Sequence, residues 1–249
     1  MLNFQILLIT LLLLVIAAPV DAKKKSRKKS RKKNKVELVQ AASLRLELID
    51  TALLAVPFGR QVDEVMSWIE KRVGQAYEPR FAGALDARER DTLKHRMRLE
   101  ISEIRNKIVT FDGQTTGFEA SVVQGEFAVK ARESLLLFRD GGTDHYLFFS
   151  EGVLWKYARP LSTAEGFKER AAGWIRDQGQ PAKREGTDVL VWRGLDYTLR
   201  LENRRLVSAS DLLIMEWNKA RSDVDARREA ARAAQGEATK ESELDSYFE

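Results

Sequence analysis

The 249-residue sequence contains no cysteine and only two histidines, His95 and His145. The absence of cysteine excludes disulfide bonds, thiolate metal ligands and a cysteine nucleophile. It also excludes a bacterial lipoprotein, because the lipid of such a protein is attached to a cysteine that follows the apolar leader. Neither histidine has a second ligand at metal-binding spacing, so we expect no metal site and no cofactor.

The motifs that mark common active sites are missing as well. The sequence has no Gly-x-Ser-x-Gly elbow, no phosphate-binding loop and no dinucleotide-binding fingerprint. Residues 140–144, "DGGTD", lack the alternating oxygen ligands and the distant Glu of a calcium loop, so they predict a hairpin turn. We therefore expect a protein that is not an enzyme. A hydrolase with an unfamiliar site is an alternative, and it requires a deep pocket with convergent carboxylates or His145.

Basic residues are concentrated in one short segment. Residues 23–35 hold ten of the 42 lysines and arginines and none of the 37 acidic residues, and Asp21 is the only charged residue in 1–22. The remainder of the chain therefore has 32 basic and 36 acidic residues, a net charge of −4. The overall charge of +5 thus belongs to this segment and gives no reason to expect a nucleic-acid-binding face on the folded body.

The amino terminus has the pattern of a secretory signal peptide. Residues 6–18 are apolar apart from one threonine, and "PVDA" then breaks the helix and supplies small residues before Lys23. We therefore predict that residues 1–22 are removed by cleavage after Ala22. No basic residue precedes the apolar run, and a dense basic block hinders translocation. The alternative is an uncleaved anchor formed by residues 2–20, with the body of the protein in the cytoplasm.

The segment after the leader, "KKKSRKKSRKKNK", contains only Lys, Arg, Ser and Asn, so we predict a disordered basic arm. We expect the arm to contact anionic lipid headgroups or another envelope polyanion, with about 1 kcal/mol per basic residue near a charged surface. A solvated linker is the simpler alternative, and nucleic acid is the least favoured partner. The predicted contact residues are Lys23, Lys24, Lys25, Arg27, Lys28, Lys29, Arg31, Lys32, Lys33 and Lys35.

The next region, residues 36–110, has helical periodicity. Apolar residues recur at spacings of three and four in three stretches, each of which predicts a helix. The first covers residues 36–56, and the second begins at Val62 and ends before Pro79. The third begins at a capping box at Asp86. We therefore expect about three helices before any strand.

A sheet is predicted to follow the helical region. At Phe111 the apolar period changes from 3.6 to 2, which predicts a mainly antiparallel sheet of seven to eight strands over residues 111–217. The expected fold class is therefore α+β. The clearest strands are expected at 127–131, 134–139, 144–150, 153–158 and 197–201.

One helix is expected within the sheet and one after it. Residues 163–178 begin at a capping box that starts with Ser162, and their apolar face should pack on the apolar face of the sheet. Residues 218–236, rich in Ala and Arg, predict a carboxy-terminal helix, with a disordered tail over 237–249. Residues 211–217 fit either a final strand or the beginning of that helix.

Aromatic residues are dense in the predicted sheet, and most of them are expected in the core. Because side chains alternate along a strand, Tyr146 and Phe148 should share one face. By the same rule Trp155 and Tyr157 should share a face. If the inserted helix covers only one side of the sheet, aromatic residues on the other side stay exposed and mark a partner surface. The predicted interaction surface consists of Tyr146, Phe148, Trp155, Tyr157 and Trp192.

Residues 57–73, "PFGRQVDEVMSWIEKRV", resemble the opening of small bacterial envelope modules of the SmpA/OmlA type. In that family a Gly precedes the acidic start of a helix, and an antiparallel sheet follows two helices. The resemblance implies a non-enzymatic accessory subunit of outer-membrane assembly, although this chain lacks the lipidation cysteine and has a longer sheet. "FDGQTTGFE" and "HYLFFSEGVLWKYARPL" are also similar to uncharacterised exported proteins of Gram-negative bacteria, which implies an envelope location and no activity.

The sequence therefore predicts an exported, non-enzymatic envelope protein that is periplasmic or secreted after cleavage. Its α+β body is expected to bind another envelope protein, while the basic arm contacts an anionic surface. The leader, the charge distribution and the missing catalytic motifs favour this hypothesis over the anchored and hydrolase alternatives.

Overall fold

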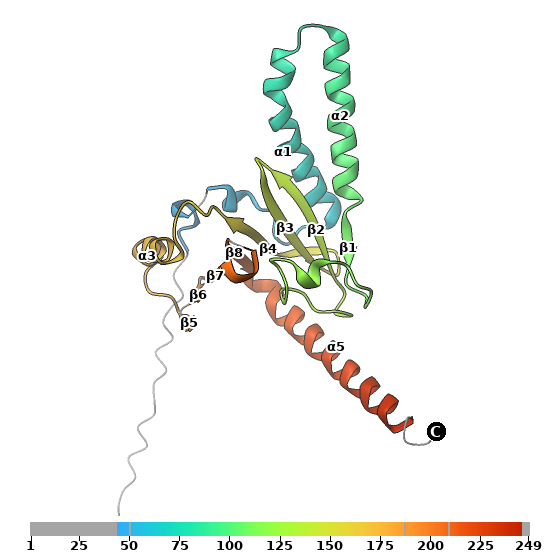
Figure 1. Ribbon diagram of the computed structural model, residues 1–249, viewed down its shortest axis with the longest axis vertical. Helices are drawn as coiled ribbons and strands as arrows, with labels where there is room; N and C mark the ends of the chain where they lie inside the picture. Colours follow the sequence, from blue (N-terminus) through green and yellow to red (C-terminus); the bar gives the residue numbers. More distant parts are fainter. Residues whose placement is uncertain (1–43, 50, 187, 209, 246–249) are drawn as a thin grey trace, which may run out of the picture. The chain divides into compact units, whose positions relative to one another are not determined.

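The computed structural model describes residues 44–49, 51–186, 188–208 and 210–245, which belong to one compact unit (Figure 1). The predicted leader, its cleavage site after Ala22 and the basic arm lie outside these residues. Across the described part of the chain, no helix combines the length and apolarity that a membrane crossing requires.

An eight-stranded antiparallel sheet forms the centre of the fold, in the order β1-β2-β3-β4-β8-β7-β6-β5 (Figure 1). The turn between β2 and β3 needs glycine, because Gly141 and Gly142 both have positive φ, 57° and 80°. The predicted α+β class, with helices before the sheet and a carboxy-terminal helix, is confirmed. The strands are β1 (Ile108–Thr110), β2 (Glu133–Asp140), β3 (Thr143–Ser150), β4 (Val153–Leu161), β5 (Lys183–Glu185), β6 (Val189–Arg193), β7 (Tyr197–Asn203) and β8 (Asp211–Trp217).

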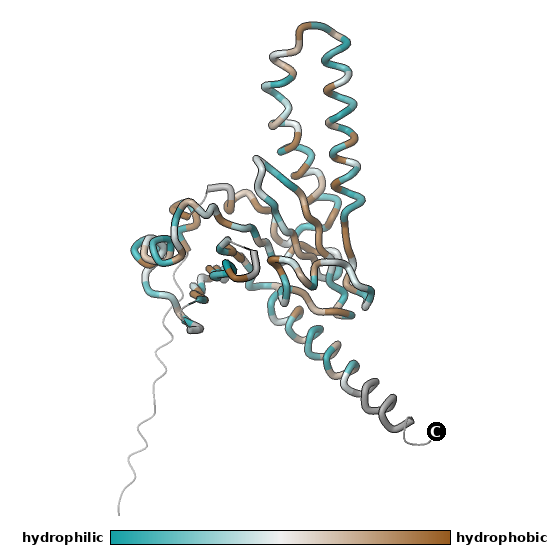
Figure 2. Tube along the Cα trace, in the orientation of Figure 1, coloured by the Kyte–Doolittle hydropathy of each residue, from teal (hydrophilic) through white to brown (hydrophobic). Residues whose placement is uncertain are grey.

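Two long helices, α1 and α2, precede the sheet and pack side by side as a hairpin (Figure 1). The predicted cap of α2 is present, since the Asp86 carboxylate accepts a hydrogen bond of 2.7 Å from the Glu89 N–H. Figure 2 shows long hydrophilic stretches along α2 and α5, in keeping with their many exposed residues. The helical elements are η1 (Leu46–Leu48), η2 (Thr51–Ala55), α1 (Val62–Gly83), α2 (Ala87–Arg105), η3 (Phe118–Ala120), α3 (Phe167–Gln178), α4 (Arg205–Ser208) and α5 (Asn218–Asp245).

One face of the sheet, here called the first face, packs against α1 and α3. Alternate strand residues such as Leu147, Leu199 and Met215 point to this side and are fully buried. From α1 the buried residues Val65 and Ile69, one helical turn apart, reach the same core. The inserted helix α3 packs on this face as predicted.

The opposite, second face is covered by the segment 111–132 and the first turns of α5. Phe148 and Ile214 form a buried cluster on this side with Val123 of the segment and Val224 of α5. Both faces of the sheet are therefore covered, and the strands are apolar on both sides, which is why their periodicity is weaker than simple alternation.

A β-bulge in β4 changes which side chains reach the second face. Phe148 pairs with Lys156, but the next residue, Phe149, pairs with Leu154, so Trp155 is an extra residue in β4. Trp155 consequently joins the core of the second face, whereas Tyr157 joins that of the first. The expectation that Trp155 and Tyr157 share a face is therefore wrong, because alternation breaks at a bulge.

The bulge also places the fully buried Lys156 on the second face, where a carboxylate of the covering segment neutralises it. Lys156 Nζ lies 3.1 Å from Glu126 Oε2 and donates to the Glu126 carbonyl as well. Arg200 and Arg204 also pair with the Glu126 carboxylate. Burial raises the pKa of Glu126, but the charges of Lys156, Arg200 and Arg204 outweigh it and lower the pKa to about 2.

A second ion pair fastens α5 to the same face. Arg228 donates to both carboxylate oxygens of the buried Glu133, at 2.6 and 2.8 Å, and to the Glu126 carbonyl at 2.8 Å. The sheet, the segment 111–132 and α5 are thus joined through neighbouring charged groups.

Two predictions in the helical region are wrong. Instead of one helix over 36–56, the described residues form two 3₁₀ turns, held to α3 by two hydrogen bonds between the Arg45 backbone and the Gln178 side chain. The helix α1 does not stop before Pro79 but continues to Gly83. Phe81, which follows this proline, packs against the core of the first face, and this contact favours the continued helix.

The strand predicted at 127–131 is absent, because Lys130 and Arg132 have positive φ, 61° and 57°, which a strand does not allow. Phe127 instead stacks on Phe111, with ring centroids 3.7 Å apart.

Three element boundaries also differ from the predictions or decide between them. The inserted helix begins at Phe167 after the N-cap Gly166, so Ser162 is not its cap. Residues 211–217 form a strand, which excludes the single long helix. The helix α5 continues beyond Gly236 to Asp245, where a disordered tail was expected.

Replacing Glu126 by Gln should lower the free energy of unfolding by about 3 kcal/mol near pH 7, because Lys156 then stays buried without its carboxylate. The Glu126 pKa is about 2 in the fold against 4.5 unperturbed, so its contribution to stability is complete above pH 4.5 and disappears as the pH falls toward 2. Urea unfolding from pH 7 to pH 2 should show this loss in the wild type and not in E126Q. Asp91→Asn, at an exposed ion pair, should change stability by less than about 0.5 kcal/mol.

Candidate functional site

The edge of the sheet at β2 is only partly covered. β1 pairs with Ser134–Leu136, and within the described chain no strand pairs with residues 137–140 on that side. The Phe111 N–H donates to the Glu133 carbonyl at 3.0 Å, so the backbone groups of Glu133 point to the β1 side of β2. In an antiparallel sheet, successive residues of a strand direct their N–H and C=O groups to opposite neighbours. Every second residue from Glu133 therefore turns its backbone groups to this edge, and the N–H and C=O of Arg139 face the uncovered part.

The end of α2 explains why β1 is so short. The Asn106 and Lys107 N–H groups still donate to helix carbonyls, those of Ser102 and Ile104, at 3.1 and 3.0 Å. The chain therefore leaves the helix only at Ile108, and it reaches the sheet too late to pair with the outer half of β2.

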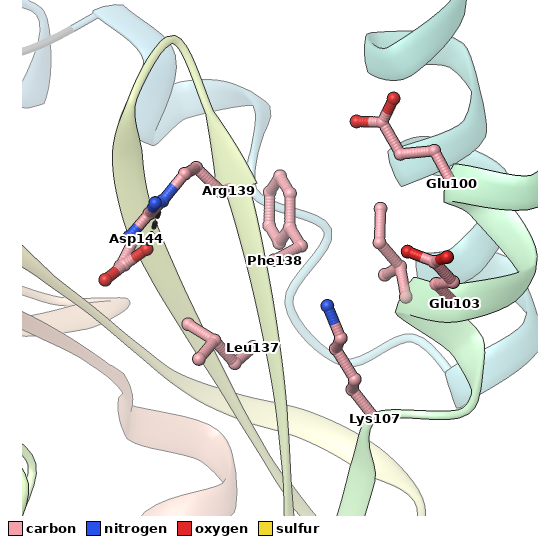
Figure 3. A pocket seen from close by; sticks show the side chains of 8 residues that line it. Glu100, Glu103, Lys107, Leu137, Phe138, Arg139 and Asp144 are labelled. Atoms are coloured by element: carbon pink, nitrogen blue, oxygen red, sulfur yellow. Dashed lines mark hydrogen bonds and ion pairs between the residues drawn. The ribbon is translucent and has the colours of Figure 1, made fainter. Parts of the chain in front are cut away.

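A cleft of about 340 Å³ lies between the last turns of α2 and the β2–β3 hairpin, directly along this uncovered edge (Figure 3). This volume is at the lower end of the range of ligand sites, and it suits a few residues of an extended chain. The residues that line the cleft are Glu100, Glu103, Ile104, Lys107, Leu137, Phe138, Arg139 and Asp144.

Charges of both signs surround the apolar residues of the cleft. In Figure 3 the Lys107 ammonium points into the cleft from the end next to β1, and Glu103 projects from the α2 wall. On the hairpin wall, Arg139 Nε donates to Asp144 Oδ1 at 2.8 Å. The cleft therefore offers backbone hydrogen-bonding groups, an apolar lining and charges that can select the side chains of a ligand.

Aromatic packing on the first face supports the hairpin. Phe138, only 2% exposed, stacks on His145 with centroids 4.8 Å apart and meets Trp68 edge-on at 5.8 Å. Nδ1 of His145 lies 2.8 Å from the Tyr157 hydroxyl. Arg72 Nε donates to Asp140 Oδ2 at 2.8 Å, which fastens the hairpin tip to α1. The wall of the cleft is thus held in place by buried contacts.

The buried His145 supports the site rather than facing it. Burial lowers the pKa of His145 to about 4, with Arg159 and Arg72 acting in the same direction and Asp140 acting against them. The imidazole is therefore neutral near pH 7, and it does not line the cleft. Among the carboxylates of the cleft, Glu100 accepts from Tyr77 and Asp144 from Arg139. Two of the three carboxylates that line the cleft therefore already have partners within the fold.

The predicted aromatic interaction surface is not a surface. All five of its residues are at most 6% exposed, because the segment 111–132 and α5 cover the second face and α1 and α3 cover the first. Trp192 packs on Trp174 at 5.6 Å and donates to the Gly179 carbonyl. The expectation of exposure is therefore wrong for Tyr146, Phe148, Trp155, Tyr157 and Trp192.

The residues of the cleft were not found from the sequence. Glu103 and Lys107 look like ordinary solvated charge on a helix, and Arg139 and Asp144 look like the ends of a hairpin turn. The sequence feature that indicates an open edge is the short apolar stretch between α2 and Phe111. This stretch is too short to pair with the whole of a strand of normal length. The described residues contain no cluster of His, Asp or Glu able to hold a metal ion, and the ten predicted contacts of the basic arm lie outside them.

Replacing His145 by Gln should remove one component of the acid sensitivity of the fold. The His145 pKa is about 4 in the fold against 6.5 unperturbed, so between these values the unfolded chain binds a proton that the folded chain does not. Stability should fall with decreasing pH over this window, by at most about 1.4 kcal/mol per pH unit. H145Q should lack this component in urea unfolding, whereas His95→Gln, at an exposed helix position, should retain it.

Comparisons with protein-family models, with curated proteins and with solved structures give no match for this chain. The resemblance of residues 57–73 to SmpA/OmlA-type modules therefore stays a prediction, and the function of the chain has to be inferred from its own geometry.

Proposed function

We propose that this chain is a protein-binding module of the cell envelope that accepts an extended segment of a partner protein as an additional strand beside β2. The observation that supports this proposal is the uncovered edge of residues 137–140, which opens into a cleft lined by α2. Addition of a strand to a sheet edge is a common mode of peptide recognition, in which backbone hydrogen bonds give affinity and side-chain pockets give specificity.

The geometry of β1 defines how the partner segment lies. It continues the line of β1, runs antiparallel to β2 and spans residues 137–140, about 13 Å at a rise of about 3.3 Å per residue. Backbone groups of the segment pair with the N–H and C=O of Arg139. Apolar side chains of the segment contact Leu137, the half-buried apolar residue of the cleft.

The charges of the cleft select the sequence of the segment. Glu100 and Glu103 favour a basic side chain along the α2 wall, and Lys107 favours an acidic one near the end of β1. An unpaired strand edge promotes aggregation unless it is protected, and the flanking helix gives this protection by admitting only a single extended chain.

The leader and the basic arm support the envelope location. In the proposal, cleavage after Ala22 releases a periplasmic or secreted protein without enzymatic activity, which acts as an accessory subunit for another envelope protein. The arm, residues 23–35, holds the body near anionic lipid or another envelope polyanion. The alternative is a body that stays in the cytoplasm, anchored by residues 2–20.

The strand-addition proposal is tested by Arg139→Pro with Arg139→Ala as its matched control. Proline removes the N–H that faces the open edge and is tolerated at such edge positions, whereas alanine removes only the side chain. Peptides are first selected from a displayed random library on the full chain. R139P should then weaken binding of the selected peptides about tenfold, since at least one backbone hydrogen bond is lost.

In the same measurement R139A should bind the selected peptides within about threefold of the wild type. Circular dichroism verifies that both variants fold. Peptides that bind R139P as tightly as the wild type, or a library that yields no binder, would contradict the proposal.

The location is tested by amino-terminal sequencing of the protein from fractionated cells. The expected result is a chain that begins at Lys23 in the periplasmic or extracellular fraction. A chain that retains residues 2–20 and fractionates with the membrane, its body protected from external protease, would instead support the anchored alternative.

A further inference from the structure

A groove on the α1–α2 hairpin combines apolar and basic side chains. Phe81 and Met97 are half-buried in it, and Arg90, Lys94 and Arg98 are exposed. The described residues that line the groove include no carboxylate, although Lys94 makes an exposed contact of 3.3 Å with Asp91, which is worth little. The complete lining is Phe81, Ala82, Arg90, Lys94, Met97 and Arg98.

The three basic residues form a regular stripe. Arg90, Lys94 and Arg98 are spaced by four residues on one side of α2, so their positions repeat about every 6 Å along the helix axis. This stripe lies outside the core of the first face, to which α2 contributes the buried Ile104. Phe81 and Met97 pack against that core as well, so each presents only part of its side chain to the groove.

The last turns of α5 have the complementary pattern in their sequence. The helix continues to Asp245, and Glu237, Glu241 and Asp245 repeat at the same spacing of four residues. In the sequence, Leu244 follows Glu237 by seven residues, a spacing at which apolar and acidic residues can share one side of a helix. An acidic stripe with an adjacent apolar residue thus matches a basic stripe with adjacent apolar residues in both charge and repeat.

We propose that the acidic stripe of α5 from one copy of the chain binds in the groove of the α1–α2 hairpin of a second copy. A second copy is favoured because α1 packs on the first face of the sheet, whereas α5 starts on the second face with Ala220 and Val224. Such a contact joins two different surfaces, so it is heterologous and makes the copies associate head to tail.

The test uses charge reversal in the full chain and measures molar mass by light scattering over a range of protein concentrations. The wild type is expected to self-associate, and less so at high salt. The groove variant Arg90→Glu/Lys94→Glu/Arg98→Glu and the tail variant Glu237→Lys/Glu241→Lys/Asp245→Lys should each raise the dissociation constant at least about tenfold. The matched control Lys71→Glu/Arg88→Glu/Arg96→Glu makes the same charge change outside the groove and should associate like the wild type.

The decisive measurement is a mixture of the groove variant and the tail variant. Each stripe then meets a partner of opposite charge on the other variant, so the mixture should associate again although neither variant does so alone. Circular dichroism excludes unfolding as the cause of lost association. A wild type that stays monomeric at all concentrations, or a mixture that does not associate, would overturn the proposal.

Anionic lipid is the other ligand chemistry that the basic stripe could attract. Vesicles that contain anionic phospholipid are therefore tested with the same variants. The basic arm, residues 23–35, is the same in the wild type and in the groove variant, so a difference between their vesicle affinities reports on the groove. If the groove variant binds vesicles more weakly than the wild type while its self-association equals that of the wild type, the groove binds a lipid surface and the proposal fails. R139P leaves the groove unchanged, so a failure of strand addition beside β2 and a failure of this contact are distinguishable.

Discussion

The buried pair of Lys156 and Glu126 is the interaction on which the second face of the sheet depends. An isolated ammonium group with no exposed surface would be strongly destabilising, so Lys156 requires a carboxylate beside it. Glu126 reaches it from the segment 111–132, a stretch that contains neither a long helix nor a strand. The ion pair therefore fixes the course of an irregular segment across the sheet, and Arg228 adds α5 to the same group of charges.

This arrangement follows from a single extra residue in β4. Without the bulge at Trp155, Lys156 would point to the first face, where α1 and α3 supply an apolar core. With the bulge, the lysine and Trp155 lie on the same side, and the ammonium rests 4.7 Å from the indole ring centre and 4.5 Å from that of Phe148. Covering the second face in this way buries the aromatic residues, whereas residues 137–140 at the β2 edge stay without a neighbouring strand in the described chain.

The parts of the fold that the sequence predicted well are those determined by local patterns. The β2–β3 and β3–β4 hairpins and the cap of α2 follow from glycine turns, alternating apolar residues and Asp86. The errors fall where contacts distant in sequence outweigh the local pattern. Phe127 stacks on Phe111 instead of extending a strand, and the packing of Phe81 against the core of the first face favours a helix that continues through Pro79. The candidate cleft could not be predicted from the sequence for the same reason. It forms because α2 ends beside β2, and β1 pairs with only part of that strand.

The sequence by itself determined the α+β class, the meander of β2, β3 and β4, and the separation of charge between a basic arm and a slightly acidic body, because these depend on neighbours along the chain. Only the tertiary structure decided which face each aromatic residue occupies, which charges are buried and where an edge stays open. These features depend on the bulge in β4, on the path of the segment 111–132 and on the length of β1. Each of them is determined by packing between residues far apart in sequence. The local periodicity of apolar residues does not predict such packing.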